Sequence, residues 1–462
     1  YGPVPSEDFL LKLSETENEM VRRRAAIQLG LNPSRRAADR LEAMLGDGDA
    51  RVRRAACEAI LRSGQLPSGS GAVLPLLADD DRTVAYLGRQ VLQRMPTADW
   101  RQEVLTSEDT RTALVGMLGL VAADPSKETG LSVLRRSGEM MNDFLSDKDF
   151  VDTLRLCQVT LSRCKISPAE ATSLRDQIAR EFPAGDSRMN HELIRLAAYL
   201  QANSVIERAL EYIESDAPEM DRVLVAMCLQ RLDRKWTARE RFTMLKFFEQ
   251  AAASETEGSL PMYIVGVTRE FARHLTEDDV QAVLDQGAKW RNAALGAIYR
   301  LERPVSDSTA AKLRRLDDEL VADPKIDDVR RRLRTGIIAM LSTAGDEAST
   351  EHLRKIWRTE PARRAVVAMA LAQEPDGDNW DYLVRSLNIL DGAAAEEVVG
   401  QLRSVPIATD DPMALRSLIL MGLRAERDDQ PFENVERLLE HWTGMQRPED
   451  VQPSMAPWQK WY

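Results

Sequence analysis

The feature that most constrains the fold is a valine that recurs at nearly constant spacing in the N-terminal part of the sequence. Val21, Val52 and Val84 are separated by 31 and 32 residues. Offsets of zero, four and eight residues fall on one face of a helix. At plus four each valine is followed by a small residue, and at plus eight by a large apolar one: Ala25, Ala56 and Gly88, then Leu29, Ile60 and Leu92. The spacing predicts a repeated helix whose apolar face lets a neighbour approach closely.

Each of the later two helices follows a turn and an earlier apolar stretch. Leu45 and Leu77 close the stretches "RLEAML" and "AVLPLL", seven residues before Val52 and Val84. The repeated unit is therefore helix, turn, helix. One such unit cannot bury its apolar face alone, so we expect the units to stack into an array in which each contacts its neighbours.

The turn between the two helices is acidic, as in "DGDARV" (47–52). Asp47 or Asp49 is placed to accept hydrogen bonds from the free N–H groups of the next helix, where its charge is also favourable. Calcium ligation by these residues and by Asp79–Asp81 is the alternative. We favour capping, because the alternating oxygen pattern and the distal Glu of a calcium loop are missing.

The stretch "DARVRRAACEAI" (49–60) resembles the second helix of a HEAT repeat, in the short form found in bacterial proteins. The resemblance covers about residues 7–96 and returns more loosely at 327–341 and 360–373. It implies an all-α fold, an α-solenoid of stacked antiparallel helix pairs (a HEAT/ARM-like superhelix). Such motifs specify a fold far better than a function.

The whole chain, 1–462, is predicted to form one continuous α-solenoid. Its length exceeds that of a single-core domain, but no long Gly/Ser/Pro linker divides it, and only 5% of its residues are aromatic. The predicted divisions are regular HEAT-like repeats (1–126), degenerate helical repeats (127–300), further HEAT-like repeats (301–445) and a Pro/Trp-containing linker to a missing downstream domain (446–462). Helix starts with capping-box character are expected within the centre: Ser167 with Glu170, Thr237 with Glu240, and Thr276 with Asp279.

The sequence predicts no catalytic, cofactor-binding or metal site. Some HEAT-type enzymes bind two irons through several His-Glu pairs, but of the four histidines only His191 is followed by Glu. The others are His274, His352 and His441, and each is expected at a surface or helix end. No nucleophile elbow, Walker loop or dinucleotide-binding glycine motif occurs.

The four cysteines are predicted to be free, buried thiols. Cys157 and Cys164 lie seven residues apart on a predicted helix, which separates them by about 10 Å along its axis; that is too far for a disulfide. Two alanines precede Cys57, and Met227 and Leu229 flank Cys228, as is usual for small core side chains. No CxxCH haem-attachment motif occurs.

The net charge of −12 argues against a nucleic-acid groove as the main purpose of the chain. The arginine clusters nevertheless allow two interpretations: a basic stripe, or a ladder in which arginines pair with acids of adjacent turns. We favour the ladder, because acids outnumber bases and few aromatic residues lie between the arginines. Arg53 and Arg54 are the arginines proposed for an interaction surface. The clusters are Arg22–Arg24, Arg35–Arg36, Arg51 with Arg53 and Arg54, Arg330–Arg332, and Arg363–Arg364.

The C-terminal segment "QRPEDVQPSMAPWQKWY" is rich in proline and ends in aromatic residues. Trp458 and Trp461 are three residues apart and would share one face of a helix. Tryptophan is enriched among residues that dominate interfaces, so both are candidate interaction residues. The alternative, which we slightly favour, is that they cap the exposed end of the last repeat.

The order of parts resembles the HEAT segment of large envelope proteins of planctomycete-type bacteria. That resemblance rests on the "RVRRAACEAI" repeats, "RQVLQRMPTADW" (89–100), the degenerate centre and the "PWQKWY" ending. It implies a dehydrogenase-like propeller before the helical array and a c-type haem domain after it, both outside this chain. It also implies an extracytoplasmic or periplasmic location, with a cytoplasmic one as the alternative. The longest apolar run, 113–123, is too short to span a membrane.

Two functions follow from this reading. The favoured one is a non-catalytic scaffold that docks a protein or the flanking domains of its own polypeptide. The alternative is a solenoid that binds nucleic acid or processes nucleobases.

Overall fold

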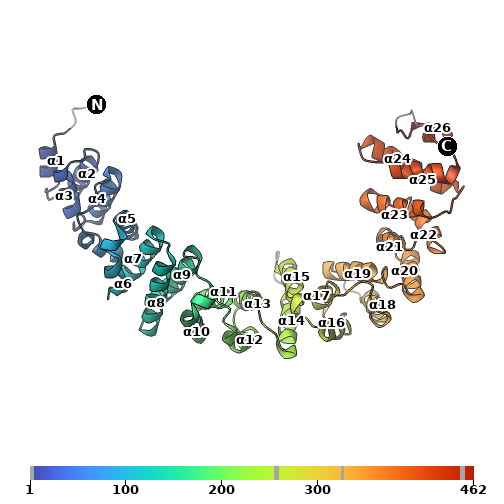
Figure 1. Ribbon diagram of the computed structural model, residues 1–462, viewed down its shortest axis with the longest axis horizontal. Helices are drawn as coiled ribbons and strands as arrows, with labels where there is room; N and C mark the ends of the chain where they lie inside the picture. Colours follow the sequence, from blue (N-terminus) through green and yellow to red (C-terminus); the bar gives the residue numbers. More distant parts are fainter. Residues whose placement is uncertain (1–4, 254–259, 324–326, 448–452) are drawn as a thin grey trace. The chain divides into compact units, whose positions relative to one another are not determined.

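The computed structural model describes residues 5–253, 260–323, 327–447 and 453–462. Every regular element within these ranges is a helix, which confirms the predicted all-α class (Figure 1). Contacts divide the chain into two compact units, residues 1–234 and 235–462. Each unit is a stack of helix pairs.

The N-terminal unit contains two rows of helices that alternate along the chain. Each helix of the second row, the B row, packs on its partner in the first row, the A row, and on the B helix of the next pair. The A row is α1 (Glu7–Leu13), α3 (Arg35–Met44), η2 (Leu74–Ala78), α6 (Arg101–Thr106), α8 (Lys127–Asn142), α10 (Thr172–Glu181) and α12 (Ile206–Glu214). The B row is α2 (Glu19–Leu29), α4 (Ala50–Ser63), α5 (Arg82–Leu92), α7 (Thr110–Ala123), α9 (Asp147–Arg163), α11 (Ser187–Tyr199) and α13 (Glu219–Leu229).

The C-terminal unit repeats this arrangement. Its A row is α14 (Ala238–Ala253), α16 (Glu277–Leu284), α18 (Asp307–Ala322), α20 (Glu347–Thr359), α22 (Asn379–Ser386) and α24 (Pro412–Arg427). Its B row is α15 (Leu260–Phe271), α17 (Arg291–Ile298), α19 (Asp328–Leu341), α21 (Arg364–Leu371), α23 (Gly392–Ser404) and α25 (Glu433–Thr443). A final short helix, α26 (Ala456–Trp461), packs against α24.

The predicted apolar face of the repeated helix is buried as expected. Val52 and Val84 are fully buried, as are the small and large residues at plus four and plus eight of all three repeats. Val21 is only partly buried, because in the described residues no other helix pair precedes its own. A Cβ atom added to Gly88 would lie 2.7 Å from Leu76 Cβ, so the small residue is a steric requirement of this packing.

Predicted caps are present at the starts of α4, α14 and α16. Asp49 accepts a hydrogen bond from the N–H of Arg51, and Thr276 forms the expected capping box with Asp279. Thr237 and Glu240 exchange the same pair of bonds. The expectation at Ser167 was wrong in one respect: its box caps a 3₁₀ turn, η4 (Pro168–Glu170), and the α-helix starts only at Thr172.

Candidate binding surfaces

A ladder of ion pairs joins successive repeats of the N-terminal unit. Arg22 on α2 donates two hydrogen bonds to Asp47 in the next turn, both at 2.8 Å. One repeat further, Arg53 donates to Asp79 at 2.7 and 3.0 Å, 26 residues along the chain. Its third guanidinium nitrogen, Nη1, also donates to two main-chain carbonyls of its own turn. The predicted pairing of arginines with adjacent acidic turns is therefore present at both places.

The ladder continues in later repeats with less regular spacing. In the N-terminal unit, Arg111 contacts two carboxylates of α9 and Arg155 contacts one of α11. In the C-terminal unit, Arg334 reaches Glu360 in the next pair at 2.7 Å. These charge-assisted bonds, which are bidentate at Arg22, Arg53 and Arg334, hold the helix pairs that they join in register. The arginines of the ladder are thus committed to structure.

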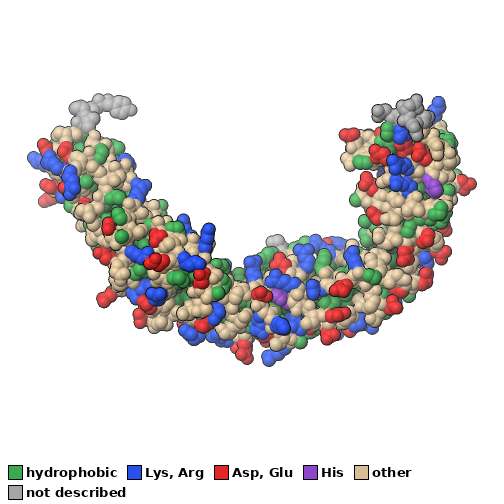
Figure 2. Space-filling model, in the orientation of Figure 1, with side chains coloured by type: hydrophobic (Ala, Val, Ile, Leu, Met, Phe, Trp, Pro, Cys, Tyr) green, Lys and Arg blue, Asp and Glu red, His purple; other side chains and the backbone are tan. Residues whose placement is uncertain are grey.

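Arg54, the neighbour of Arg53, is not part of the ladder. Its side chain is exposed and forms an ion pair with Glu58, one turn along the same helix, at 2.8 Å. On the face shown in Figure 2, basic and acidic side chains are interspersed over both units. Arg53 and Arg54 are therefore not equivalent surface residues, and only Arg54 offers an accessible guanidinium.

The two tryptophans of the C-terminal tail also differ. Trp458 is 4% exposed and packs where α26 meets the last helix pair, whereas Trp461 is 43% exposed. The side chain of Met455, just before α26, contacts Gly422 on α24, where a Cβ would lie 2.6 Å from it. Trp458 thus covers the last repeat, as the capping interpretation expects, and Trp461 offers an accessible ring. Residues 448–452 of the expected linker lie outside the described part.

The histidines do not converge. His191 Nε2 lies 2.7 Å from Asp221, and His352 Nε2 lies 3.2 Å from Asp317, so both are bound within the helical stack. His352 is buried in the middle of α20, in place of the expected surface or helix-end role. His274 ends the 3₁₀ turn η6 (Ala272–His274), as expected for a helix end, and packs against the rings of Trp236 and Phe271. In the described residues no group of three or more His, Cys, Asp or Glu side chains is arranged to hold a metal ion.

The cysteines are free and buried, as predicted. Burial raises the pKa of the Cys57 and Cys157 thiols to about 12, and that of Cys228 to about 11. Thiols with such pKa values stay protonated near neutral pH and are poor nucleophiles. Separately, none of the described helices is long and apolar enough to cross a membrane.

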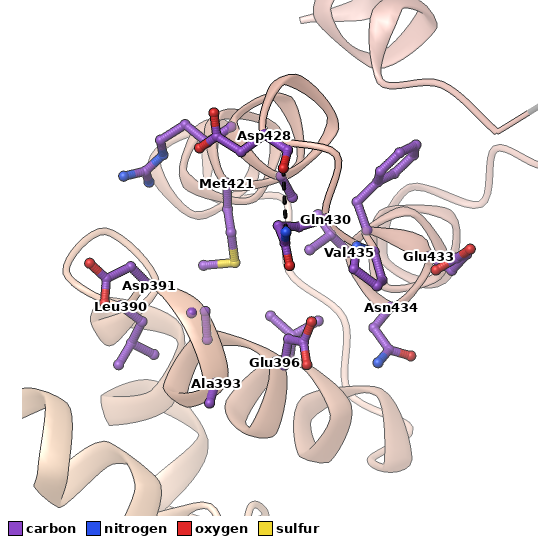
Figure 3. Close-up of a pocket in the computed structure, with 17 residues that line it drawn as sticks. Leu390, Asp391, Ala393, Glu396, Met421, Asp428, Gln430, Glu433, Asn434 and Val435 are labelled. Atoms are coloured by element: carbon purple, nitrogen blue, oxygen red, sulfur yellow. Dashed lines mark hydrogen bonds between the residues drawn. The ribbon is translucent and has the colours of Figure 1, made fainter. Parts of the chain in front are cut away.

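A cavity of about 520 Å³ opens between α23, α24 and α25 in the C-terminal unit (Figure 3). Its apolar lining comes from all three helices and includes Leu390, Val399, Met421 and Val435. Met421 points from α24 into the space towards α23 (Figure 3). The rim carries carboxylates from both sides: Asp391, Glu396, Asp428 and Glu433. One basic residue, Arg424, is among the described lining residues.

The start of α23, beside this cavity, differs from the start of the first B helices. The fourth residue of α2 and of α4 is a ladder arginine, Arg22 or Arg53, whereas the fourth residue of α23 is Ala395. Ala393 and Ala394 precede it, so the first turn of α23 sends no long side chain towards the turn at 428–432. The sequence reasoning missed this site; the alanine run "GAAAEE" in place of a ladder arginine was the available signal.

Comparison with known proteins identifies the repeats at the N-terminal end. Residues 7–93 match HEAT repeats. This is the stretch that contains the two regular ladder pairs, Arg22 with Asp47 and Arg53 with Asp79. No curated protein matches the sequence.

Solved structures of low similarity include several large helical-repeat proteins. A chain from the structure of Kap95p with RanGDP has 12% sequence identity and a TM-score of 0.40. The match covers 94% of this chain and 66% of the other, so this chain spans just under two thirds of that chain's length. Importin beta has 9% identity and a TM-score of 0.37, over 94% of this chain and 72% of that one. A chain from a structure on the interaction between cadherin and beta-catenin has 16% sequence identity and a TM-score of 0.34. The match covers 95% of this chain and 99% of that one.

Proposed function

We propose that this chain is a non-catalytic scaffold that binds a polypeptide in the cavity between α23, α24 and α25. The observation that carries the proposal is the cavity itself, which combines an apolar lining with a carboxylate-bearing rim. Its volume of about 520 Å³ lies in the usual range of ligand-binding pockets. A polypeptide can place an apolar side chain against the lining while its main chain follows the rim.

The rim also bears on the alternative function. Nucleic acid carries a negatively charged phosphate at every nucleotide, and proteins bind it by neutralising these phosphates with Lys and Arg. The four carboxylates around the cavity repel phosphates, and the net charge of −12 acts in the same direction over longer distances. A salt titration with duplex DNA tests this directly: micromolar binding with a steep salt dependence would overturn the ranking.

Two finer proposals concern the setting of the scaffold. We propose that the bound polypeptide is a flanking domain of a larger protein that also carries a dehydrogenase-like propeller and a c-type haem domain, and that this protein is extracytoplasmic. Both rest on the resemblance to planctomycete-type envelope proteins. The sequence of the complete reading frame tests them, because a CxxCH motif downstream and a signal peptide upstream are expected.

Selection from a displayed random-peptide library tests the binding proposal. We expect the wild-type chain to select peptides with apolar residues, and Ala393→Trp to lose them because the indole fills the cavity. Ala393 is exposed, so this change leaves the helix packing intact. Ala311→Trp, at an exposed position on α18, is the matched control and should select the same peptides as the wild type. Peptides that bind all three proteins equally would place the binding site elsewhere and refute the proposal.

A further inference from the structure

A different cavity, of about 630 Å³, lies between the B helices α17 and α19 of the C-terminal unit. Its lining is aliphatic and includes Leu295, Ile298 and Met340. Its charged lining residues are three arginines, Arg303, Arg331 and Arg332, and no Asp or Glu is among the described residues that line it. A cavity whose charged lining residues are all arginines is unexpected in a chain with a net charge of −12.

Neighbouring residues extend the positive surface and leave it only partly neutralised. Arg331 and Arg332 share one carboxylate, that of Asp328, at 3.0 and 2.9 Å. Tyr299 also lines the cavity and is 63% exposed. The guanidinium of Arg269, on α15, lies 5.6 Å from the centre of the Tyr299 ring. We call the set formed by Arg269, Tyr299, Arg303, Arg331 and Arg332 the Arg–Tyr surface.

We propose that the Arg–Tyr surface binds a carboxylate-rich segment of a partner protein, with an apolar side chain of that segment inserted into the cavity. Arginine guanidinium groups match carboxylates in planar, bidentate geometry, and several of them together select an acidic segment. The aliphatic lining gives the same segment an anchor, because burial of one large apolar side chain is favourable. This binding site is separate from the cavity at α23–α25 and does not depend on it.

Single-stranded nucleic acid is the competing occupant of a surface with arginines and a tyrosine. It would rely on base stacking, but Arg269 already covers one face of the only aromatic ring that lines the described cavity. The aliphatic lining suits a Leu or Ile side chain better than a polar base edge. An acidic polypeptide is therefore the favoured occupant.

Fluorescence anisotropy with labelled probes tests the proposal on the complete chain. The probes are a short peptide of Asp and Glu around one central Leu, the same peptide with Gly in place of Leu, a Lys/Arg counterpart, and a single-stranded oligonucleotide. We expect the Leu-containing acidic peptide to bind most tightly and the basic peptide not to bind. Arg303→Glu and Arg332→Glu should each weaken the acidic peptide about tenfold or more, because each reverses one charge at the contact.

Two further variants separate local contacts from general charge effects. Arg315→Glu, an exposed arginine of α18 whose ion pairs are with Asp285 and Glu319, changes the net charge equally and should leave the affinity unchanged. Ala339→Leu narrows the cavity and should weaken the Leu peptide but not the Gly peptide. Circular dichroism establishes that each variant is folded.

Three outcomes would overturn the inference. Tighter binding of the oligonucleotide than of the acidic peptide, with the same dependence on Arg303 and Arg332, would make this a nucleic-acid surface. If Arg315→Glu lost as much affinity as Arg303→Glu and Arg332→Glu, the weaker binding would be due to the overall charge of the chain and not to local contacts. Absence of acidic-peptide binding at low salt would exclude the site.

Discussion

Arg334 and Asp317 form a bidentate ion pair inside the C-terminal unit, with nitrogen–oxygen distances of 2.6 and 3.0 Å. Their side chains are 4% and 1% exposed, respectively. Arg334 also bonds Glu360 of the next helix pair, and His352 Nε2 lies 3.2 Å from the second Asp317 oxygen. Three successive elements of the stack therefore depend on one buried carboxylate.

Replacement of that carboxylate should open the middle of the C-terminal unit. Asp317→Asn leaves Arg334 with one of its two carboxylate partners, and loss of one member of a buried pair typically costs about 3–5 kcal/mol. We expect a fall of that order in the free energy of urea-induced unfolding, with faster hydrogen exchange in α18 and α19. Asp318→Asn, at the exposed neighbouring position, is the control and should change little. Equal effects of the two substitutions would show that the buried pair contributes no more than a surface one.

The same carboxylate predicts a dependence of stability on pH. Burial alone would raise the pKa of Asp317, but hydrogen bonds from His352 and Arg334 outweigh it and lower the pKa below its ordinary value. Its contribution is therefore complete above the unfolded-state pKa of about 3.9 and is lost as the pH falls through the folded-state value. The difference in unfolding free energy between wild type and Asp317→Asn should therefore be smaller in acid, below the folded-state pKa of Asp317, than at neutral pH. A difference that persists unchanged in strong acid would contradict this assignment.

Adjacent arginines in the second repeat should differ sharply in their effect on stability. Arg53→Met removes the bonds to Asp79 and to the carbonyls of its own turn, and we expect a loss of about 2 kcal/mol. Hydrogen exchange should increase at the start of α4 and in the turn at 79–81. Arg54→Met removes only an exposed pair with Glu58 and should have little effect on exchange or on the unfolding midpoint. Similar results for the two variants would mean that the ladder does not stabilise the stack.

The small residue in the middle of the repeated helix should not tolerate a charge. Ala56 is fully buried, so Ala56→Glu introduces a carboxylate without a partner at a cost of several kcal/mol. In a repeat array the damage should spread mainly to neighbouring pairs, as faster hydrogen exchange over residues 20–95. Arg62→Glu, at an exposed position of the same helix, is the control. Unchanged exchange in Ala56→Glu would show that the assigned packing register is incorrect.

The C-terminal tail offers a test of the capping role. Trp458→Ala should undock α26 from the last pair, because replacement of a buried Trp by Ala typically costs about 3–5 kcal/mol. The expected readout is faster hydrogen exchange in α24 and greater protease sensitivity after residue 445. Trp461→Ala should leave both unchanged and, if Trp461 contacts a partner, lower only the affinity for that partner. Equal protease sensitivity of the two variants would argue against a structural cap.

Much of the fold follows from short-range sequence patterns. The recurring valine with its small and large followers predicted which residues of the first three repeats are buried, and all but Val21 are buried fully. Asp49 and Thr276 marked helix starts correctly, because a cap bonds to N–H groups two or three residues away. Ser167 marked a real box but a different helix type, since the chain forms a 3₁₀ turn before α10.

The binding surfaces were decided by tertiary structure. Arg53 and Arg54 are neighbours in sequence, yet only Arg53 points towards the turn 26 residues later, because successive residues of a helix project in different directions. The cavity at α23–α25 and the Arg–Tyr surface are formed by side chains from separate helix pairs. The sequence by itself determined the periodic core and the helix starts, since both depend on residues within one or two turns of each other. Which charges are buried in pairs, and which remain open to a partner, depends on contacts that exist only once the helices are stacked.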